Sequence, residues 1–130
     1  MQAAGRALVS VVLVNFRGVD DTLTAVRALR ECEWPAEQLE IVVVENGSGD
    51  DSLERLAAEP GIVVVESKEN LGFAGGCNLG VARSTGDVVA FLNNDAKPDA
   101  RWISEAARCV SEHSPSRIRC RLVLRGSCSA

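Results

Sequence analysis

Two amides and a carboxylate, Asn93-Asn94-Asp95, follow directly after the apolar run at residues 88–92. Their oxygen atoms suit a hard divalent cation, and protein sites for Mg²⁺ often use only one or two carboxylates, with water and substrate phosphates as the other ligands. A metal held there would neutralise charge on phosphate oxygens as a bond to them breaks. The alternative is purely structural, because an Asp shortly before Pro98 also forms ordinary turns.

Polar segments also follow three other apolar runs, at residues 15–18, 45–50 and 66–72. Each one alone is adequately explained as a turn, because Asn, Gly and Asp are common turn formers. In an open parallel sheet, however, ligands bind outside the carboxyl ends of the strands. If all four runs are parallel strands, the four polar segments converge at one edge, which makes a binding site there the stronger interpretation.

The apolar runs that must position these segments are rich in valine and nearly continuous, as strands buried on both faces are. The expected strands span residues 8–14, 39–44, 62–65 and 87–92. Helical spacing alternates with them, and the expected helices begin at the capping sequences 20–22 and 50–52, span 73–84 and follow Pro98. This alternation predicts an α/β fold with a mostly parallel sheet, helices on both faces and right-handed crossovers.

The third expected helix carries Gly75, Gly76 and Gly80, although each interior glycine costs about 1 kcal/mol relative to alanine. One interpretation is that the backbone there must approach a ligand or a neighbouring strand closely. The other interpretation is close helix–sheet packing without any ligand. The sequence alone favours the first only slightly.

A chain of 130 residues, 46% of them hydrophobic, is long enough for one compact domain and too short for two. Its formal charge of −4 argues against nonspecific binding to nucleic acid, which needs a basic face. The five cysteines form no C-x-x-C pair and the single histidine has no partner at zinc-site spacing, so neither a structural zinc nor a disulfide framework is expected. Neither a secretion signal nor a membrane-spanning run is evident, which favours a cytoplasmic protein, at most peripheral at the inner face of the membrane.

Three common classes of phosphate-binding α/β protein are excluded by their motifs. A Rossmann dinucleotide site needs G-x-G-x-x-G after the first strand, where this chain has only Gly18. Gly75 and Gly80 have the P-loop spacing, but Val81-Ala82 stand where the motif requires Lys followed by Ser or Thr. A receiver domain would need a carboxylate pair at the end of the first strand, and Asp20-Asp21 come too late.

Four segments in order, at residues 11–16, 44–50, 69–80 and 86–95, together resemble the amino-terminal half of a family 2 glycosyltransferase with the GT-A fold. The stretches NLGFAGGCNLG and FLNNDA are the most specific, and they resemble the rhamnosyltransferase-like branch of that family. The resemblance implies a Rossmann-like, nucleotide-diphospho-sugar transferase sheet flanked by helices and incomplete at the carboxyl terminus.

The resemblance also implies a nucleotide-sugar donor, dTDP-rhamnose or a UDP-sugar, bound at this edge with Mg²⁺ or Mn²⁺. Asp95 would be the metal ligand, in the place of the family's D-x-D motif. The residues expected at the donor by position are Val14, Asn15, Phe16, Glu45, Asn46, Gly72, Phe73, Asn78, Asn93 and Asn94. Glu45 and Asn93 depart from the pattern, because relatives commonly have Asp at the first position and a carboxylate at the second.

An inverting transfer is the implied reaction, in which an acceptor hydroxyl attacks the anomeric carbon and nucleoside diphosphate leaves on the metal. The acceptor would be a saccharide or a lipid-linked acceptor, as in cell wall polysaccharide biosynthesis, and no nucleic acid would take part. The attack needs a general base, which the family places in its carboxy-terminal half, and no residue of this chain matches that role. A noncatalytic nucleotide or nucleotide-sugar binding module is the alternative function, and the oligomeric state stays open.

The charge is divided unevenly along the chain, since residues 114–130 carry four arginines and no acid, whereas residues 1–113 hold 10 basic and 18 acidic groups. This divides the chain into a nucleotide-sugar-binding half-domain at 1–113 and a basic tail at 114–130. The preferred interpretation is a truncated or frameshifted glycosyltransferase with weak activity or none. The alternative is a native domain whose tail binds an anionic partner or membrane surface, or adds a strand.

Overall fold

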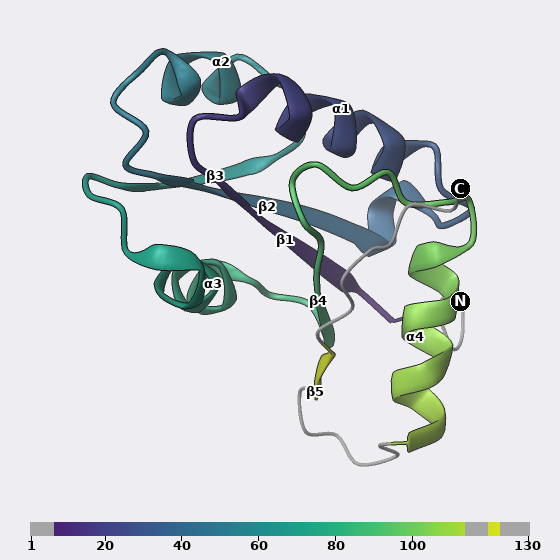
Figure 1. The fold of residues 1–130 in the computed structure, drawn as a ribbon. Helices are drawn as coiled ribbons and strands as arrows, with labels where there is room; N and C mark the ends of the chain where they lie inside the picture. Colours follow the sequence, from purple (N-terminus) through teal and green to yellow (C-terminus); the bar gives the residue numbers. More distant parts are fainter. Residues whose placement is uncertain (1–6, 114–119, 123–130) are drawn as a thin grey trace.

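A computed structural model describes residues 7–113 and 120–122 of the chain. Its centre is a single sheet of five parallel strands in the order β3-β2-β1-β4-β5 (Figure 1). The strands are β1 (Val9–Asn15), β2 (Leu39–Asn46), β3 (Val63–Ser67), β4 (Val88–Phe91) and β5 (Cys120–Leu122). The predicted parallel α/β sheet is therefore confirmed, and all four expected strands lie where the valine-rich runs placed them.

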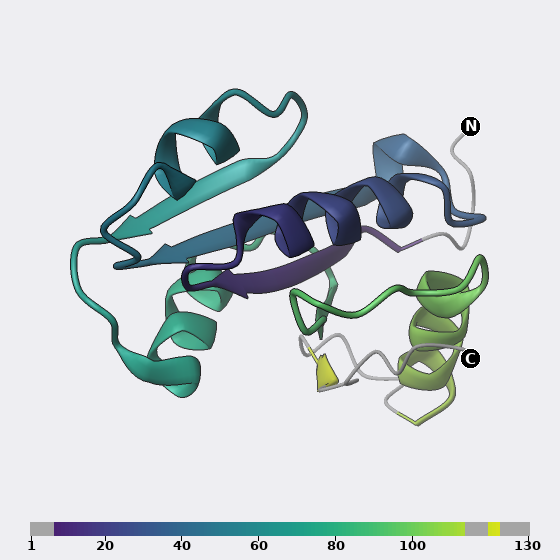
Figure 2. The same cartoon turned by 45° about the horizontal axis from the view of Figure 1, so that its top comes forward.

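Helices cover both faces of this sheet, as the alternating pattern predicted (Figure 2). They are α1 (Val19–Arg30), α2 (Ser52–Ala57), α3 (Gly72–Arg83) and α4 (Trp102–His113), with a short 3-10 helix, η1 (Ala36–Gln38), before β2. Buried side chains of α1, α2 and α4 pack together on one face, and α3 packs on the other. Within the described part of the chain, no helix is long and apolar enough to cross a membrane.

The predicted start of the first helix is wrong by a few residues. The helix begins at Val19, with Gly18 as its N-cap and no capping hydrogen bond from a side chain. Asp20 and Asp21 lie in its first turn, where their charge interacts favourably with the helix dipole, and Thr22 is fully buried. The helix starts at Val19 because the Gly18 carbonyl already accepts a helical hydrogen bond of 3.0 Å from the backbone N–H of Thr22, and the Val19 side chain is buried in the core.

The second helix begins at Ser52, close to the predicted capping sequence. Its N-cap residue is Asp51, whose side chain makes no capping bond. The side chain of Asp50 instead accepts a hydrogen bond of 2.9 Å from the backbone N–H of Ser52.

Two glycines of α3 allow that helix to lie directly on the sheet. A Cβ atom added at Gly80 would overlap Cγ1 of Val12 and lie 3.2 Å from Cγ2 of Val44. One added at Gly76 would lie 2.8 Å from Cγ1 of Val14. Close helix–sheet packing therefore explains both glycines, and α3 is fixed at a short distance above β1 and β2.

Glu40 joins three segments near the amino ends of the strands. Its carboxylate accepts hydrogen bonds from the Ser10 hydroxyl at 2.6 Å and from the backbone N–H of Thr85 at 2.8 Å. Burial opposes ionisation of this carboxyl, but the hydrogen bonds from Ser10 and Thr85 outweigh it and lower the pKa of Glu40. These hydrogen bonds hold the segment before β4 against β1 and β2. They therefore fix β4, and the predicted metal-binding turn follows the other end of that strand.

The predicted tail at 114–130 lies mostly outside the described residues. Its described part is β5, whose Cys120 pairs in register with Val88 of β4 and whose Leu122 pairs with Ala90. The additional strand considered for this region therefore includes Leu122.

Candidate functional site

The carboxyl ends of β1, β2 and β3 lie side by side in the sheet. Asn15 of β1 is in register with Glu45 of β2, and Glu45 is in register with Glu66 of β3. The turn at 93–95 follows β4, which pairs with β1 on its other side. The four polar segments singled out in the sequence therefore meet at one edge of the sheet.

Glu45 points into the protein and holds the loop that follows β2. Its side chain is almost fully buried, with 4% of the residue exposed. The carboxylate accepts hydrogen bonds from the Asn15 amide at 3.0 Å, from the Ser48 backbone N–H at 3.0 Å and from the Ser48 hydroxyl. With its oxygens bonded in this way, Glu45 fixes the shape of the site.

Asn46 connects the same loop to the start of α3. Its amide nitrogen donates to the Gly72 carbonyl at 3.1 Å, and its amide oxygen accepts the backbone N–H of Leu71 at 3.1 Å. The next residue, Gly47, has a φ of +75°, and a Cβ there would lie 2.6 Å from the backbone nitrogen of Asn70. A glycine is needed at this position because the two loops pass too close for any side chain.

A second set of hydrogen bonds links β1 to the turn after β4. The Thr22 hydroxyl donates to Oδ1 of Asn15 at 2.6 Å, and Nδ2 of Asn94 donates to the same hydroxyl at 3.1 Å. The sequence predicts for Thr22 only a place in a capping sequence. Its bond to Asn94 is not predictable because the two residues lie far apart along the chain, and the local signal is limited to a polar residue on the buried face of α1.

Three aromatic or aliphatic side chains remain exposed at this edge of the sheet. They belong to Phe16, Leu71 and Phe73, with 40%, 43% and 55% of each residue exposed. The guanidinium of Arg17 lies over the Phe16 ring, 4.9 Å from its centroid, and Nε of Arg17 donates to the Ser48 carbonyl at 3.1 Å. The exposed Phe16 ring beside this cation suits a planar heterocycle attached to an anion.

Asn93 and Asp95 are also exposed at this edge, whereas Asn94 is half-buried. Among the described residues, no group of three or more His, Cys, Asp or Glu side chains could hold a metal ion. The described residues therefore do not form a site in which the protein supplies all the ligands of a metal ion. They fit a Mg²⁺ or Mn²⁺ ion that takes one carboxylate from the protein and its other ligands from water and phosphate oxygens.

Two of the remaining predicted donor residues, Val14 and Gly72, lie close to the same edge. Gly72 begins α3 with a φ of +76°, and Val14 is half-buried at the end of β1 and packs against the cluster below α3. Asn78 differs, because it is exposed halfway along α3, and Gly76 and Gly80 show that the sheet lies on the other side of that helix. The structure thus brings together the predicted residues of the strand ends and turns, but it does not place Asn78 with them.

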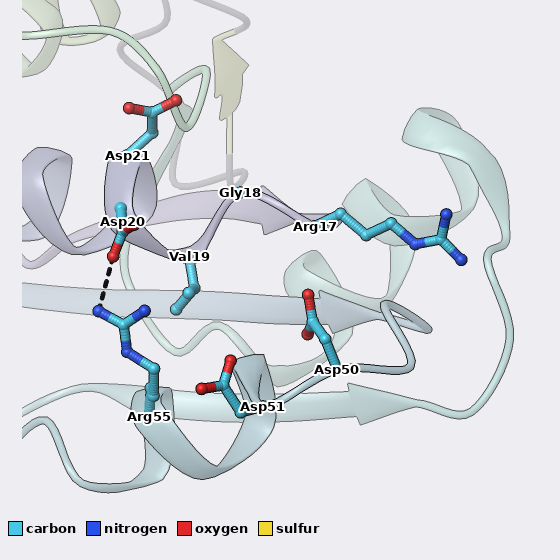
Figure 3. A pocket seen from close by; sticks show the side chains of 8 residues that line it. All are labelled: Arg17, Gly18, Val19, Asp20, Asp21, Asp50, Asp51 and Arg55. Atoms are coloured by element: carbon cyan, nitrogen blue, oxygen red, sulfur yellow. Dashed lines mark hydrogen bonds and ion pairs between the residues drawn. The ribbon is translucent and has the colours of Figure 1, made fainter.

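Beside the site, a groove of about 440 Å³ opens between the start of α1 and the start of α2 (Figure 3). Acidic side chains dominate its lining, which consists of Arg17, Gly18, Val19, Asp20, Asp21, Asp50, Asp51 and Arg55. Arg55 is paired with Asp20 at 2.7 Å, and Figure 3 shows Arg17 extending away from the acids. The acidic side chains would repel a phosphate group here, so the groove is not where we expect a phosphate, although it shares Arg17 with the site.

Cys32 and Cys77 are not activated nucleophiles. Burial raises the pKa of the Cys32 thiol to about 11, and it also raises the pKa of Cys77. Thiols with such pKa values stay protonated at neutral pH, which agrees with their expected role as small buried side chains.

Comparison with known proteins identifies the family. Residues 10–121 match Glycosyl transferase family 2. The chain belongs to this family. Among its curated relatives are the glycosyltransferase AglE of Haloferax volcanii, 25% identical over 107 residues, and the uncharacterized glycosyltransferase Rv1514c of Mycobacterium tuberculosis, 29% identical over 111 residues. The matches cover 79% and 82% of this chain but only 35% and 41% of those relatives. The chain therefore spans less than half the length of these two relatives.

Solved structures confirm the GT-A fold expected for a family 2 glycosyltransferase. The mannosyltransferase PcManGT of Pyrobaculum calidifontis, solved with GDP-Man and Mn²⁺, superposes with a TM-score of 0.71 at 24% identity, over 86% of this chain and 34% of that one. TarS of S. aureus in complex with UDP gives a TM-score of 0.71 at 21% identity, over 81% of this chain and 32% of that one. At these identities the structures establish the shared fold.

Proposed function

We propose that the carboxyl edge of this sheet binds the nucleotide-diphospho-sugar donor of a glycosyltransferase. The observation that supports this most strongly is the convergence of three turns. Asn15 links the end of β1 to the loop after β2 and to Thr22, and Thr22 in turn accepts a hydrogen bond from Asn94 of the turn after β4. Phe16 and Asp95 stay exposed at the same edge. Membership of glycosyltransferase family 2, and neighbours solved with GDP-Man or with UDP, favour a nucleotide sugar as the ligand.

Within this site, the exposed residues contact the donor and the buried ones position them. Phe16, next to Val14 in the chain, offers a surface for the base, and Phe73 is exposed in the first turn of α3. Asn78, further along α3, would reach the donor only if the bound sugar extends over that helix. Asn15, Glu45 and Asn46 are the buried residues that position the exposed ones, because their polar atoms are already hydrogen-bonded to protein groups.

The turn after β4 would hold a divalent cation between the protein and the diphosphate. Asp95 supplies the carboxylate, and Asn93 supplies an amide oxygen on the exposed side of the turn. When bound, Mg²⁺ or Mn²⁺ neutralises the charge that develops on the leaving diphosphate. The neutral Asn93 in place of a carboxylate lowers the negative charge of the turn, so the ion binds mainly together with the nucleotide.

The complete reaction is an inverting transfer from a nucleotide sugar to a hydroxyl of a saccharide or lipid-linked acceptor. A rhamnosyltransferase-like specificity, with dTDP-rhamnose as donor and a role in cell wall polysaccharide synthesis, is the finer form of this proposal. It rests on the sequence NLGFAGGCNLG and on FLNNDA. Residues 1–113 are the donor-binding part, and the basic segment at 114–130 is not assigned a catalytic role.

Calorimetric titration of the 130-residue chain with UDP, GDP and dTDP, each with and without Mn²⁺, tests the proposal. We expect at least one of the three to bind, and its Kd to fall about tenfold or more when Mn²⁺ is present. The matching nucleoside is the control, because it has no phosphate to share with the metal and its affinity should not respond to Mn²⁺. A folded chain that binds none of the three diphosphates under either condition would show that the proposal is wrong.

A further inference from the structure

We propose that Thr22 is a positioning residue that links two parts of the donor site. One is the base side, formed by Asn15 and Phe16 at the end of β1, and the other is the metal turn at residues 93–95. This inference rests on the proposed function, and it adds to it a residue of α1 that does not contact the ligand. Thr22 is fully buried, so a bound ligand cannot reach it, and it acts on the site through the two side chains to which its hydroxyl is bonded, Asn15 and Asn94.

Among the described residues, the Thr22 hydroxyl is hydrogen-bonded both to Asn15 at the end of β1 and to Asn94 in the turn after β4. It donates to Oδ1 of Asn15 at 2.6 Å, and it accepts from Nδ2 of Asn94 at 3.1 Å. A hydroxyl is suited to this place because it can donate and accept at the same time. A valine has nearly the same shape but can do neither.

The two partners differ in what else holds them. The amide of Asn15 also donates to Glu45 at 3.0 Å and lies 3.5 Å from the Ser48 hydroxyl, so it stays fixed without Thr22. For the Asn94 side chain, the bond to Thr22 is the only hydrogen bond within the described part of the chain. Loss of the hydroxyl should therefore release the turn at 93–95 and leave the base side in place.

Packing limits where Asn94 can point, which makes the bond to Thr22 decisive. A Cβ atom at Gly18 would lie 3.0 Å from Nδ2 of Asn94, so the amide passes directly over the backbone of that glycine. Asp95 follows Asn94 immediately, and its direction depends on how this turn is held. Residues that orient a metal ligand from behind typically change metal affinity 10–100-fold when they are replaced.

Thr22 could also act only within α1, through a bond to the helix backbone. Thr24 is a matched control that separates this local role from an effect on the site. The Thr22 hydroxyl also lies 3.1 Å from the Gly18 carbonyl, four residues earlier in the helix. Thr24 makes the same kind of bond to the Asp20 carbonyl at 3.0 Å, but its side chain is exposed. Replacing Thr24 by valine removes a similar local bond without touching the site.

The test compares T22V, T22S and T24V with the unchanged 130-residue chain by calorimetry, using the nucleoside diphosphates above. The measured quantity is the metal increment, which is the Kd without Mn²⁺ divided by the Kd with Mn²⁺. We expect T22V to lower this ratio about tenfold while the metal-free Kd changes little. T22S, which keeps the hydroxyl, and T24V should both retain the ratio of the unchanged chain.

Several outcomes would overturn the inference. A T22V chain with an unchanged metal increment, a T22S chain as impaired as T22V, or an equal loss in T24V would each contradict a specific role for the hydroxyl. If circular dichroism shows that T22V does not fold, N94A decides the question, because it removes the other partner of the same bond and should also lower the ratio. An unchanged ratio in N94A would then refute the coupling.

If the proposed function itself is wrong, the calorimetric result differs from the one that refutes the role of Thr22. In that case the unchanged chain binds none of the nucleotides, and the inference falls with it. If the unchanged chain binds with a metal increment that T22V preserves, the proposed function stands and only the role of Thr22 is refuted.

Discussion

Replacement of Asp95 by alanine is expected to remove the metal dependence of nucleotide binding. Asp95 is the exposed carboxylate of the turn after β4, and among the described residues no group of three or more metal-ligating side chains could replace it. Without it, an ion would have only amide oxygens from the protein, which are weaker ligands than a carboxylate. The Kd measured with Mn²⁺ should rise about tenfold or more, to the value measured without it.

Asp21→Ala is the matched control for this loss. Asp21 is also an exposed aspartate near the same edge of the sheet, in the groove beside α1, so its removal changes the net charge by the same amount. Calorimetry should show a nearly unchanged metal increment in this variant. An Asp95→Ala chain that still binds nucleotide more tightly with Mn²⁺ would place the metal elsewhere in the protein.

The second large effect is on stability, and it comes from Gly80. A valine at this position would force its side chain into Val12 and Val44, where even a single added Cβ atom has no room. Overpacking of a core usually costs 1–3 kcal/mol, and β-branched Val12 and Val44 have little freedom to move aside. We expect Gly80→Val to lower the free energy of unfolding by about 3 kcal/mol and the Tm by roughly 10 °C or more.

Ala82→Val separates packing from helix propensity in this experiment. Ala82 lies on the exposed side of the same helix, so valine there should cost only about 0.5 kcal/mol through its lower helix propensity. Thermal unfolding followed by circular dichroism measures both variants. A Gly80→Val chain that melts within a degree or two of Ala82→Val would mean that α3 does not lie as close to the sheet as the structure shows.

Much of the fold is readable from the sequence, and the reason is physical. A parallel sheet covered on both faces requires continuous apolar runs, and runs such as 39–44 contain almost nothing else. The polar segments stand out because they interrupt this pattern where strands end. Family resemblance carries the assignment further, from a binding edge to a glycosyltransferase of family 2.

Helix starts and backbone detail are less readable. The aspartates at 20–21 have the composition of a cap, yet the helix begins earlier, with Gly18 as its N-cap and the first helical hydrogen bond from the backbone N–H of Thr22 to the Gly18 carbonyl. In the loop before it, the left-handed residue is Arg17, with a φ of 53°, and not Gly18. That conformation is held by the hydrogen bonds from Arg17 to Ser48, a residue from another loop.

The direction of polar side chains is the part that sequence does not provide. Glu45 and Asp95 both follow strands and both read as candidate ligand contacts, but one is buried and bonded to Ser48 while the other is exposed. Nothing in their neighbours along the chain distinguishes them. Only the packing of loops that are distant in sequence determines which carboxylate faces inward.

The central claim is that the carboxyl edge of the sheet binds the donor, and NMR of the individual backbone amides tests it most directly. The chain is titrated with Mg²⁺ and a nucleoside diphosphate that binds in calorimetry. If the carboxyl edge is the donor site, the signals that move should be those of Phe16, Ser48, Leu71 and Asp95. Residues around the apolar groove near the other end of β2, such as Arg30 and Trp34, should not respond. Shifts confined to that groove, with no change at Phe16 or Asp95, would contradict the account.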